Sequence, residues 1–291
     1  MSLDLHQDSA WFQEAIRHTA AVTGFLPRLI EKDYFCSVLL EALSTGSHTL
    51  VFKGGTCLSK IHAGFFRLSE DLDFSLSMPV DSTRGERSRI AAPLRAQLEE
   101  ALMRAPALSI DQPLTGSNNC TQYGALIAYT SVLTGQTEAL KFEVGLREPV
   151  CQPPLEGMAL TLVRNPLTDR PALPAIPVRS LTYEEAMAEK IRAALCRREP
   201  AIRDFFDVGF ALRDGRLDLA EPGFRDLVLR KIQVAGTETP DLSPARIEQL
   251  RRQVETHLRP VLREPDAQAF SLDTTLAAVR DFALSLGLVT V

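Results

Sequence analysis

Long apolar runs are missing from this sequence of 291 residues. No stretch approaches the roughly 20 apolar residues that a membrane-spanning helix needs. The N-terminus also has neither the basic region nor the apolar region of a secretory signal. We therefore expect a globular protein without a membrane partner, with enough residues for one large domain or two ordinary ones.

Cysteine pairs at metal-binding spacing and an excess of positive charge are missing as well. The five cysteines are scattered, and none of them stands in CxxC spacing. This pattern argues against a disulfide framework or a zinc ribbon and fits a reduced cytoplasm. The formal net charge of −5 is unlike that of a generic nucleic-acid coat protein, although it is compatible with a local basic groove. These absences favour a cytoplasmic enzyme.

The sequence contains two halves of different character. In the first half, helical patterns over about residues 9–45 and 88–105 alternate with strand patterns. Ser9 is the expected N-cap of the first helix, Gly24 its stop, and Pro27 lies near the start of the second helix. The predicted strands are 48–53, 72–77, 123–133 and 138–148, of which the last two form a hairpin through "TGQT".

Prolines crowd residues 149–177, and the pattern after them is helical to the end of the sequence. Such a proline-rich segment predicts a linker, a wrap-around segment or an edge strand rather than a central strand. Ser180 is the expected N-cap of the next helix. The predicted fold class is α/β (α+β), with a mixed sheet flanked by helices in residues 1–178 and an all-helical domain in residues 179–291.

Two aspartates stand two positions apart in the strand pattern "DLDFSL". On a strand, alternate side chains share a face, so Asp71 and Asp73 point the same way while Leu72 and Phe74 point to the core. Two carboxylates this close repel each other, and a cation between them relieves the repulsion. Mg²⁺ suits such a pair, because it takes one or two protein carboxylates and completes its shell from water and phosphate oxygens. The alternative is a solvated strand face.

A glycine pair in "KGGT" lies between a predicted strand and a predicted helix, shortly before the aspartates. Gly54 and Gly55 let a phosphate approach the backbone, and the N-terminus of the following helix offers N–H groups to it. Thr56 adds a hydroxyl donor, and Lys60 shares its helix face. The sequence is not a Walker A loop, because GxxxxGK[ST] is absent.

A third acid, Glu143, lies on a later predicted strand. Lys141, Glu143 and Gly145 share one face of that strand, while Phe142 and Val144 share the other. Two carboxylates from one strand and a third from its neighbour are the arrangement of two-metal phosphoryl transfer. The plain alternative for Glu143 is an exposed strand residue.

These motifs carry a family resemblance. A glycine turn, a D-x-D strand and a later third acid resemble the nucleotidyltransferase superfamily that includes DNA polymerase β. More narrowly, the sequence is similar to the AbiEii/AbiGii toxin family of bacterial toxin–antitoxin and abortive-infection systems. The matching segments, in order, are "IEKDY" from Ile30, "FKGGTCLSK" from Phe52, "RLSEDLDF" from Arg67 and "EKIRAALCRREPAIRDFFDV" from Glu189.

The resemblance implies roles for individual residues. It implies that the glycine turn binds a nucleoside triphosphate and that the aspartates bind Mg²⁺ (or Mn²⁺). It also implies that Lys190 reaches the phosphates and that Asp207, which matches the family pattern better than Asp204, is functional. An ordinary solvated helix is the alternative for Lys190, because acids are interleaved with the bases there. The predicted nucleotide-binding residues are Gly54, Gly55, Thr56, Lys60, Arg67 and Ser69. The predicted metal ligands are Asp71, Asp73 and Glu143. The predicted catalytic residues are these three acids together with Lys190 and Asp207.

The implied activity is nucleotidyl transfer from an NTP to an RNA acceptor, namely the tRNA 3′ end, which blocks translation. A cognate antitoxin protein is the implied partner. The alternatives are an enzyme that modifies a small molecule or a protein hydroxyl, and a nucleotide-binding module with an inactive site. For "EKDY" at Glu31–Tyr34, the choice lies between a charge cluster on a helix surface and residues that support the site.

Overall fold

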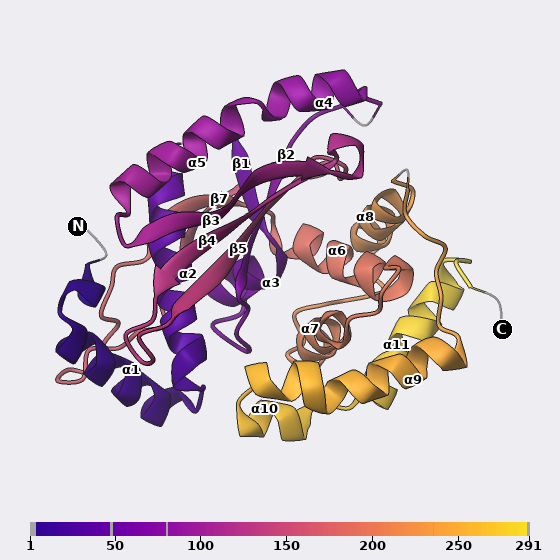
Figure 1. Cartoon of the computed structure of the whole chain (residues 1–291). Helices are drawn as coiled ribbons and strands as arrows, with labels where there is room; N and C mark the ends of the chain where they lie inside the picture. Colours follow the sequence, from indigo (N-terminus) through magenta and orange to yellow (C-terminus); the bar gives the residue numbers. More distant parts are fainter. Residues whose placement is uncertain (1–3, 47–48, 80, 235, 290–291) are drawn as a thin grey trace. The chain divides into compact units, whose positions relative to one another are not determined.

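The computed structural model describes residues 4–46, 49–79, 81–234 and 236–289 (Figure 1). It contains two compact units, Met1–Leu181 and Thr182–Val291, which we describe one at a time. The first unit holds a mixed sheet with flanking helices and the second unit is helical, which confirms the predicted fold class. The domain division at residues 178 and 179 stays a prediction, because compact packing does not show that either part folds alone.

Two long helices open the first unit after a short 3₁₀ turn, η1 (Leu5–Gln7). Helix α1 (Ser9–Thr23) is capped by Asp8, whose side chain accepts a hydrogen bond from the Trp11 N–H, so the prediction of Ser9 as the cap is wrong by one residue. Gly24 ends α1 in the left-handed region at φ 79°, as predicted. Helix α2 (Pro27–Ser44) begins at the predicted proline and is buried along most of its length.

The sheet has seven strands in the order β3-β4-β5-β2-β1-β7-β6. Parallel pairs join β2 to β5 and β1 to β7, and the other neighbours are antiparallel. The strands are β1 (Leu50–Lys53), β2 (Asp71–Leu76), β3 (Leu108–Ser117), β4 (Gln122–Thr130), β5 (Thr137–Gly145), β6 (Leu155–Ala159) and β7 (Ile176–Ser180). The predicted strand at 48–53 is found from Leu50; its residue 48 lies outside the described residues.

Aromatic side chains form the core on one face of the central strands. Phe74 on β2 contacts Phe52 on β1 and Phe142 on β5, with ring centroids 5.3 and 5.6 Å apart. All three rings are buried, and they lie on the face opposite to that of Asp71 and Asp73, because side chains alternate along a strand. This packing fixes the register that positions the aspartates.

Helices α4 (Arg84–Ala91) and α5 (Pro93–Arg104) occupy the predicted region at 88–105, and the β4–β5 hairpin confirms the predicted pair of strands. The proline-rich segment supplies the edge strand β6, as one of the alternatives predicted. The same segment also supplies β7, which contains Pro177. β7 is an inner strand, and the prediction had excluded an inner strand in this segment. Pro177 is tolerated because the ladder pairing of β7 with β1 is at Phe52 and Ser180, beyond the proline, so no hydrogen bond to β1 is needed from residue 177.

The second unit consists of helices joined by short loops. Thr182, not Ser180, caps the first of them, because its side chain accepts a hydrogen bond from the Glu185 N–H. None of the helices that the structure describes is long and apolar enough to cross a membrane. The helices are α6 (Tyr183–Cys196), α7 (Ile202–Arg213), α8 (Pro222–Ile232), α9 (Pro244–Gln253), α10 (Glu264–Ala269) and α11 (Leu272–Ser285), with the short turns η4 (Val254–Leu258) and η5 (Arg259–Val261) after α9.

Candidate active site

The glycine turn lies directly against the D-x-D strand. The chain leaves β1 through Gly54 and Gly55 into the short helix α3 (Gly54–Cys57) and the π-helical turn η2 (Leu58–His62). Gly54 has a φ of +76°, and a Cβ at this position would collide with the Asp73 carboxylate. A side chain at residue 54 is therefore excluded twice, by the left-handed backbone and by the carboxylate beside it.

Arg67 and Ser69, two of the predicted nucleotide-binding residues, lie against Gly55, the second glycine of the turn. A Cβ at Gly55 would stand 2.5 Å from Arg67 Nη2 and 2.9 Å from Ser69 Oγ. Arg67 is buried, and its Nη1 donates to the Leu68 carbonyl at 3.1 Å. The structure thus brings Arg67 and Ser69 together with the turn, and their contact with a nucleotide stays a prediction.

Thr56 ties the turn to β2. Its side chain is buried, and its hydroxyl donates to the Asp71 carbonyl at 2.5 Å. The predicted role for this hydroxyl was a phosphate contact. In the structure the hydroxyl fixes the backbone of Asp71 and so helps to position its carboxylate, and the phosphate contact of Thr56 stays a prediction.

The register of β5 beside β2 completes one polar face of the sheet. Asp71 stands opposite Lys141, and Asp73 stands opposite Glu143. On the other side of β2, Asp73 stands opposite Lys53 of β1. Register partners share a face, and we call this set the carboxylate face. It consists of Lys53, Asp71, Asp73, Lys141 and Glu143.

Glu143 is held by neighbours on the carboxylate face. Its Oε2 lies 2.9 Å from Lys141 Nζ, and its Oε1 accepts a hydrogen bond of 2.6 Å from Gln122 Nε2. Within the described residues, no group of three His, Cys, Asp or Glu side chains is placed to hold a metal ion. Glu143 as a third metal ligand stays a prediction, because each of its carboxylate oxygens keeps a lone pair beyond the one hydrogen bond that it accepts.

Lys141 responds electrostatically to the aspartate pair. Burial lowers the pKa of Lys141, but the hydrogen bond and charge of Glu143, with the charges of Asp71 and Asp73, outweigh burial and raise the pKa overall. The ammonium is thus stabilised in its charged form beside the two aspartates. A positive charge next to a carboxylate pair reduces the repulsion between the carboxylates.

Lys60 is not on the carboxylate face. Its side chain is 0% exposed, and its ammonium lies 2.8 Å from Asp33 Oδ1 and 2.8 Å from Ser37 Oγ, both on α2. Burial raises the pKa of Asp33, although the charge and hydrogen bond of Lys60 act in the opposite direction. In the structure its ammonium is thus paired inside the protein, and the phosphate contact of Lys60 stays a prediction.

The "EKDY" segment of α2 holds three parts of the scaffold. Glu31 is buried and accepts hydrogen bonds from Ser131 Oγ at 2.7 Å and from the Val132 N–H at 2.6 Å, just after β4. Its neighbour Lys32 lies 2.8 Å from Glu70 Oε2, next to Asp71, while the following aspartate holds Lys60. The surface-cluster alternative is thereby excluded, and the segment supports the strands of the site.

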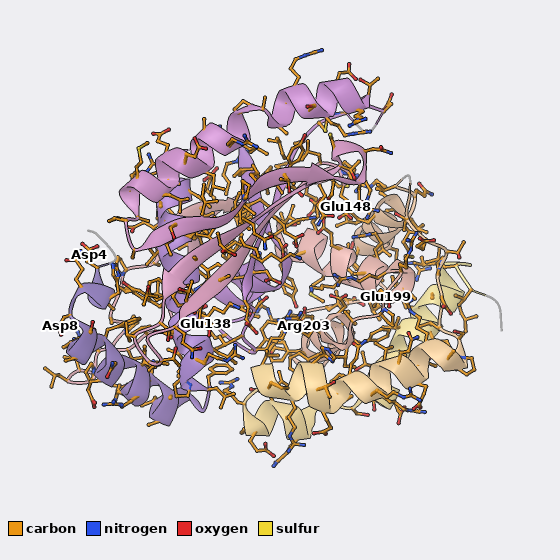
Figure 2. The ribbon with its side chains drawn as sticks, in the orientation of Figure 1. Asp4, Asp8, Glu138, Glu148, Glu199 and Arg203 are labelled. Carbon is orange, nitrogen blue, oxygen red and sulfur yellow. The ribbon has the colours of Figure 1, made fainter. Side chains whose placement is uncertain are left out.

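Lys53 and Glu148 are the residues of this region to which the sequence assigned no role. Lys53 Nζ lies 3.3 Å from Glu148 Oε2, and Glu148 is buried. Glu148 is one of the side chains labelled in Figure 2. The available signal was strand alternation: Lys53 comes directly before the glycine turn, at the end of a strand that pairs with the aspartate strand. The pairing of those strands was not predicted, so the signal could not be read.

In the second unit, Lys190 and Asp207 are brought together. Lys190 Nζ on α6 lies 2.9 Å from Asp207 Oδ2 and 2.8 Å from Asp204 Oδ1, both on α7. Arg197 Nη1 lies 3.1 Å from the other oxygen of Asp204. Burial acts to raise the pKa of Asp204, but Lys190 and Arg197 outweigh it and lower the pKa to about 2. Asp207, which was predicted to be functional, and Asp204, the poorer match, therefore both contact the predicted lysine.

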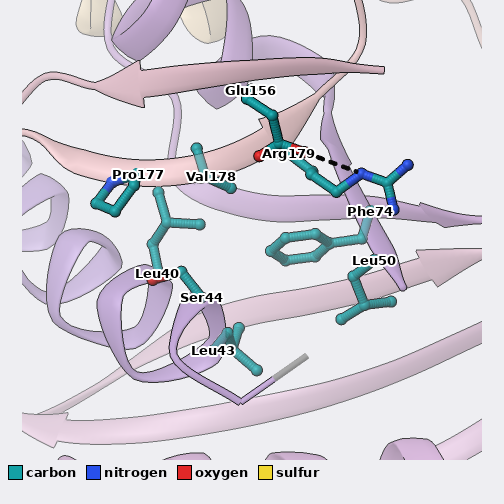
Figure 3. A pocket seen from close by; sticks show the side chains of 9 residues that line it. All are labelled: Leu40, Leu43, Ser44, Leu50, Phe74, Glu156, Pro177, Val178 and Arg179. Atoms are coloured by element: carbon teal, nitrogen blue, oxygen red, sulfur yellow. Dashed lines mark ion pairs between the residues drawn. The ribbon is translucent and has the colours of Figure 1, made fainter. Parts of the chain in front are cut away.

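A pocket of about 160 Å³ lies elsewhere in the first unit (Figure 3). Phe74 lines it, so the pocket is on the side of β2 that faces away from the aspartates. Arg179 and Glu156 form an ion pair of 3.4 Å among its lining residues. The remaining lining residues are Leu40, Leu43, Ser44, Leu50, Pro177 and Val178. This pocket is separate from the carboxylate face.

Comparison with known proteins gives a family match and similar solved structures. The family model described as nucleotidyl transferase AbiEii toxin, type IV toxin–antitoxin system, matches residues 38–281. MenT4, a nucleotidyltransferase toxin from Mycobacterium tuberculosis H37Rv, superposes with a TM-score of 0.57 at 18% identity, over 95% of this chain and 89% of that one. A structure titled putative nucleotidyltransferase from H. pylori has a TM-score of 0.49 at 15% identity, over 90% and 96% of the two chains. No curated protein matches the chain.

Proposed function

This chain belongs to the AbiEii nucleotidyl transferase toxin family and is a nucleotidyltransferase, and we propose that it transfers a nucleoside monophosphate from an NTP to the 3′ end of tRNA. The observation that carries the proposal is the contact between the glycine turn and the D-x-D strand, in which the Asp73 carboxylate lies against Gly54. A triphosphate on this turn has its phosphates beside two carboxylates. The modified tRNA no longer serves translation, which accounts for toxicity.

The aspartate pair fits a divalent metal ion. Asp71 and Asp73 share a face and would hold Mg²⁺ or Mn²⁺ together with phosphate oxygens and water, which is the ligand set that Mg²⁺ prefers. A bound metal ion would neutralise charge on the phosphates and activate the acceptor hydroxyl. We propose that Asp73 accepts the proton of that hydroxyl and that Lys190, as the family resemblance implies, stabilises the charge that develops on the pyrophosphate leaving group.

The acceptor is the part of the proposal that the family membership leaves open. The carboxylate face supports transfer to any hydroxyl, so a small molecule or a protein side chain is the second candidate. A tRNA acceptor predicts strong salt dependence of the reaction, because several backbone phosphates are contacted. We place the protein in the cytoplasm, where tRNA and NTPs are present, with a cognate antitoxin as its partner.

The test is transfer of label from each of the four α-labelled NTPs to bulk tRNA in the presence of Mg²⁺. Asp71→Asn removes one proposed metal ligand, and Asp111→Asn is a matched control at an exposed position on β3. We expect labelled tRNA from the wild type and D111N, and a decrease of at least about 10³-fold for D71N. Pyrophosphate release without labelled tRNA, when cell extract is added, would move the acceptor away from tRNA. NTP binding without any transfer would indicate an inactive binding module.

A further inference from the structure

The lysine before the glycine turn reaches across the aspartate strand. Lys53 is the last residue of β1 and the register partner of Asp73, so its side chain is on the carboxylate face. Its Nζ lies only 3.9 Å from where a Cβ of Gly145 on β5 would be. Because β2 lies between β1 and β5, the side chain of Lys53 must cross in front of β2 beside Asp73.

A glutamate holds the ammonium in this position. Glu148 Oε2 lies 3.3 Å from Lys53 Nζ, and Glu148 Oε1 accepts from Arg147 Nη2 at 2.9 Å. The side chains of Lys53 and Glu148 are 15% and 9% exposed, so water screens their attraction less than it would at the surface. Lys53 is thus a preorganised cation next to the turn, unlike the fully buried Lys60.

We propose that the Lys53 ammonium contacts the phosphates of the bound nucleotide, and that it forms its ion pair with Glu148 when no nucleotide is bound. This inference rests on the proposed function. A triphosphate on Gly54 and Gly55 places up to four negative charges beside the residue that precedes them in the chain. A lysine ammonium is a compact charge suited to such oxygens. The phosphate replaces Glu148 as the partner of Lys53.

Competition between Glu148 and phosphate for the Lys53 ammonium predicts effects on phosphate binding that a purely structural ion pair does not predict. If Glu148 and phosphate compete for Lys53, then Glu148→Gln strengthens phosphate binding and Lys53→Met weakens it. Removing Glu148 also removes a repulsive charge, and that part of the gain does not depend on the lysine. The competitive part must therefore shrink when Lys53 is absent, which a double-mutant cycle measures.

The experiment measures binding of inorganic triphosphate to the full chain by calorimetry at a fixed Mg²⁺ concentration. We expect the Kd to increase about 10- to 100-fold in K53M, less in K53R, and to decrease about 3- to 10-fold in E148Q. In K53M/E148Q the decrease caused by E148Q should be largely lost. Arg104→Met, which removes another glutamate-paired cation of the first unit, should leave the Kd unchanged.

Two results would overturn the inference about Lys53. One is a wild-type Kd in folded K53M, as judged by circular dichroism. The other is an E148Q gain that persists in full in the double variant, or weaker binding by E148Q alone. This second test does not depend on the folding of K53M, because Lys53→Gln also removes the charge and can replace K53M in the cycle. Absence of triphosphate and NTP binding by the wild type is a different failure, since it contradicts the proposed function itself.

Discussion

The two lysines that were expected to bind phosphate have different environments in the two units. Lys60 in the first unit is 0% exposed and faces one carboxylate, that of Asp33. Lys190 in the second unit is 14% exposed and faces two carboxylates, those of Asp204 and Asp207. Lys60 was predicted from its position on a helix face and Lys190 from the family resemblance, yet only Lys190 has a partly exposed side chain. The difference lies in what surrounds the helix, not in the helix.

The pKa directions of the two aspartates express the same difference. Burial raises the pKa of Asp33 because one lysine does not compensate for it. For Asp204, burial acts the same way, but Lys190 and Arg197 together outweigh it and lower the pKa to about 2. The buried pair of the first unit is therefore under-compensated, whereas the cluster of the second unit is well compensated.

The largest expected effect is on stability, from Lys60→Met. The substitution leaves Asp33 buried without its cation, and removing one partner of a buried pair costs about 3–5 kcal/mol. We expect the unfolding free energy to fall by this amount in urea titrations of the full chain. A loss below about 1 kcal/mol would show that Lys60 is not buried as described.

The matched control for Lys60→Met is the double variant Lys60→Met with Asp33→Leu. Replacing both partners of a buried ion pair by apolar residues is often neutral or stabilising. We expect most of the stability lost in K60M to return, since no uncompensated charge remains. Equal losses in the single and double variants would mean that packing, not charge, makes this position sensitive.

Much of the fold follows from local pattern, and the exceptions have a common cause. β1, β2, β4 and β5 were predicted from alternation and from the glycine turns between them. β3 was missed because Pro113 and a row of exposed polar side chains hide its pattern, which an edge strand permits. β7 was excluded because of Pro177, although residue 177 does not have to donate a backbone hydrogen bond to β1. Pairing partners, which decide both cases, are not visible in a single segment.

The candidate site shows the same limit. Alternation places Asp71 and Asp73 on one face, and the structure agrees. The partners of Thr56 and Lys60 were not visible in the sequence, because the Thr56 hydroxyl donates to the Asp71 backbone on β2 and the Lys60 ammonium donates to Ser37 on α2. Lys53 was overlooked because the pairing of β1 with β2 was not predicted. Local pattern identified the acids, while the placement of the cations required the tertiary structure.

Replacing Lys190 by Arg tests the lysine of the second unit in the comparison with Lys60, and its expected effect is smaller than that of K60M. Arg keeps a positive charge between Asp204 and Asp207, so we expect the stability to stay within about 1 kcal/mol of the wild type. The compact ammonium is lost, and the proposed charge stabilisation of the leaving group with it. We expect kcat for tRNA labelling to fall about 10²-fold, equivalent to about 2.7 kcal/mol.

The control for K190R is Arg197→Lys, which changes the other cation beside Asp204 and keeps its charge. We expect little change in kcat for R197K, because no phosphate contact is proposed for Arg197. Wild-type turnover in both K190R and Lys190→Gln would contradict a catalytic role for Lys190 and leave it, like Lys60, as a structural cation.

The depressed pKa of Asp204 predicts a loss of stability in acid. Its folded-state pKa of about 2 lies below the ordinary value of 3.8, so the ionised carboxylate stabilises the folded state at pH values above about 4. That contribution, about 2 kcal/mol, is lost as the pH falls from about 4 to 2. Hydrogen exchange of α6 and α7 amides should show this decrease in the wild type and a flatter profile in Asp204→Asn. Parallel profiles would mean that Lys190 and Arg197 do not lower this pKa.

The smallest expected effect concerns Lys32, the neighbour of Asp33 on α2. Its ion pair with Glu70 is 2.8 Å long, close to the Lys60–Asp33 distance, but the side chains of Lys32 and Glu70 are 15% and 23% exposed. Water and salt screen this pair, so Lys32→Gln should cost only about 0.5–1 kcal/mol of unfolding free energy, and less at 1 M salt. K32Q and K60M each remove a lysine that lies 2.8 Å from a carboxylate oxygen. The difference between their losses of unfolding free energy therefore measures the effect of burial. If K32Q costs as much as K60M, burial is not what separates the two pairs, and the contrast between Lys60 and Lys190 needs another explanation.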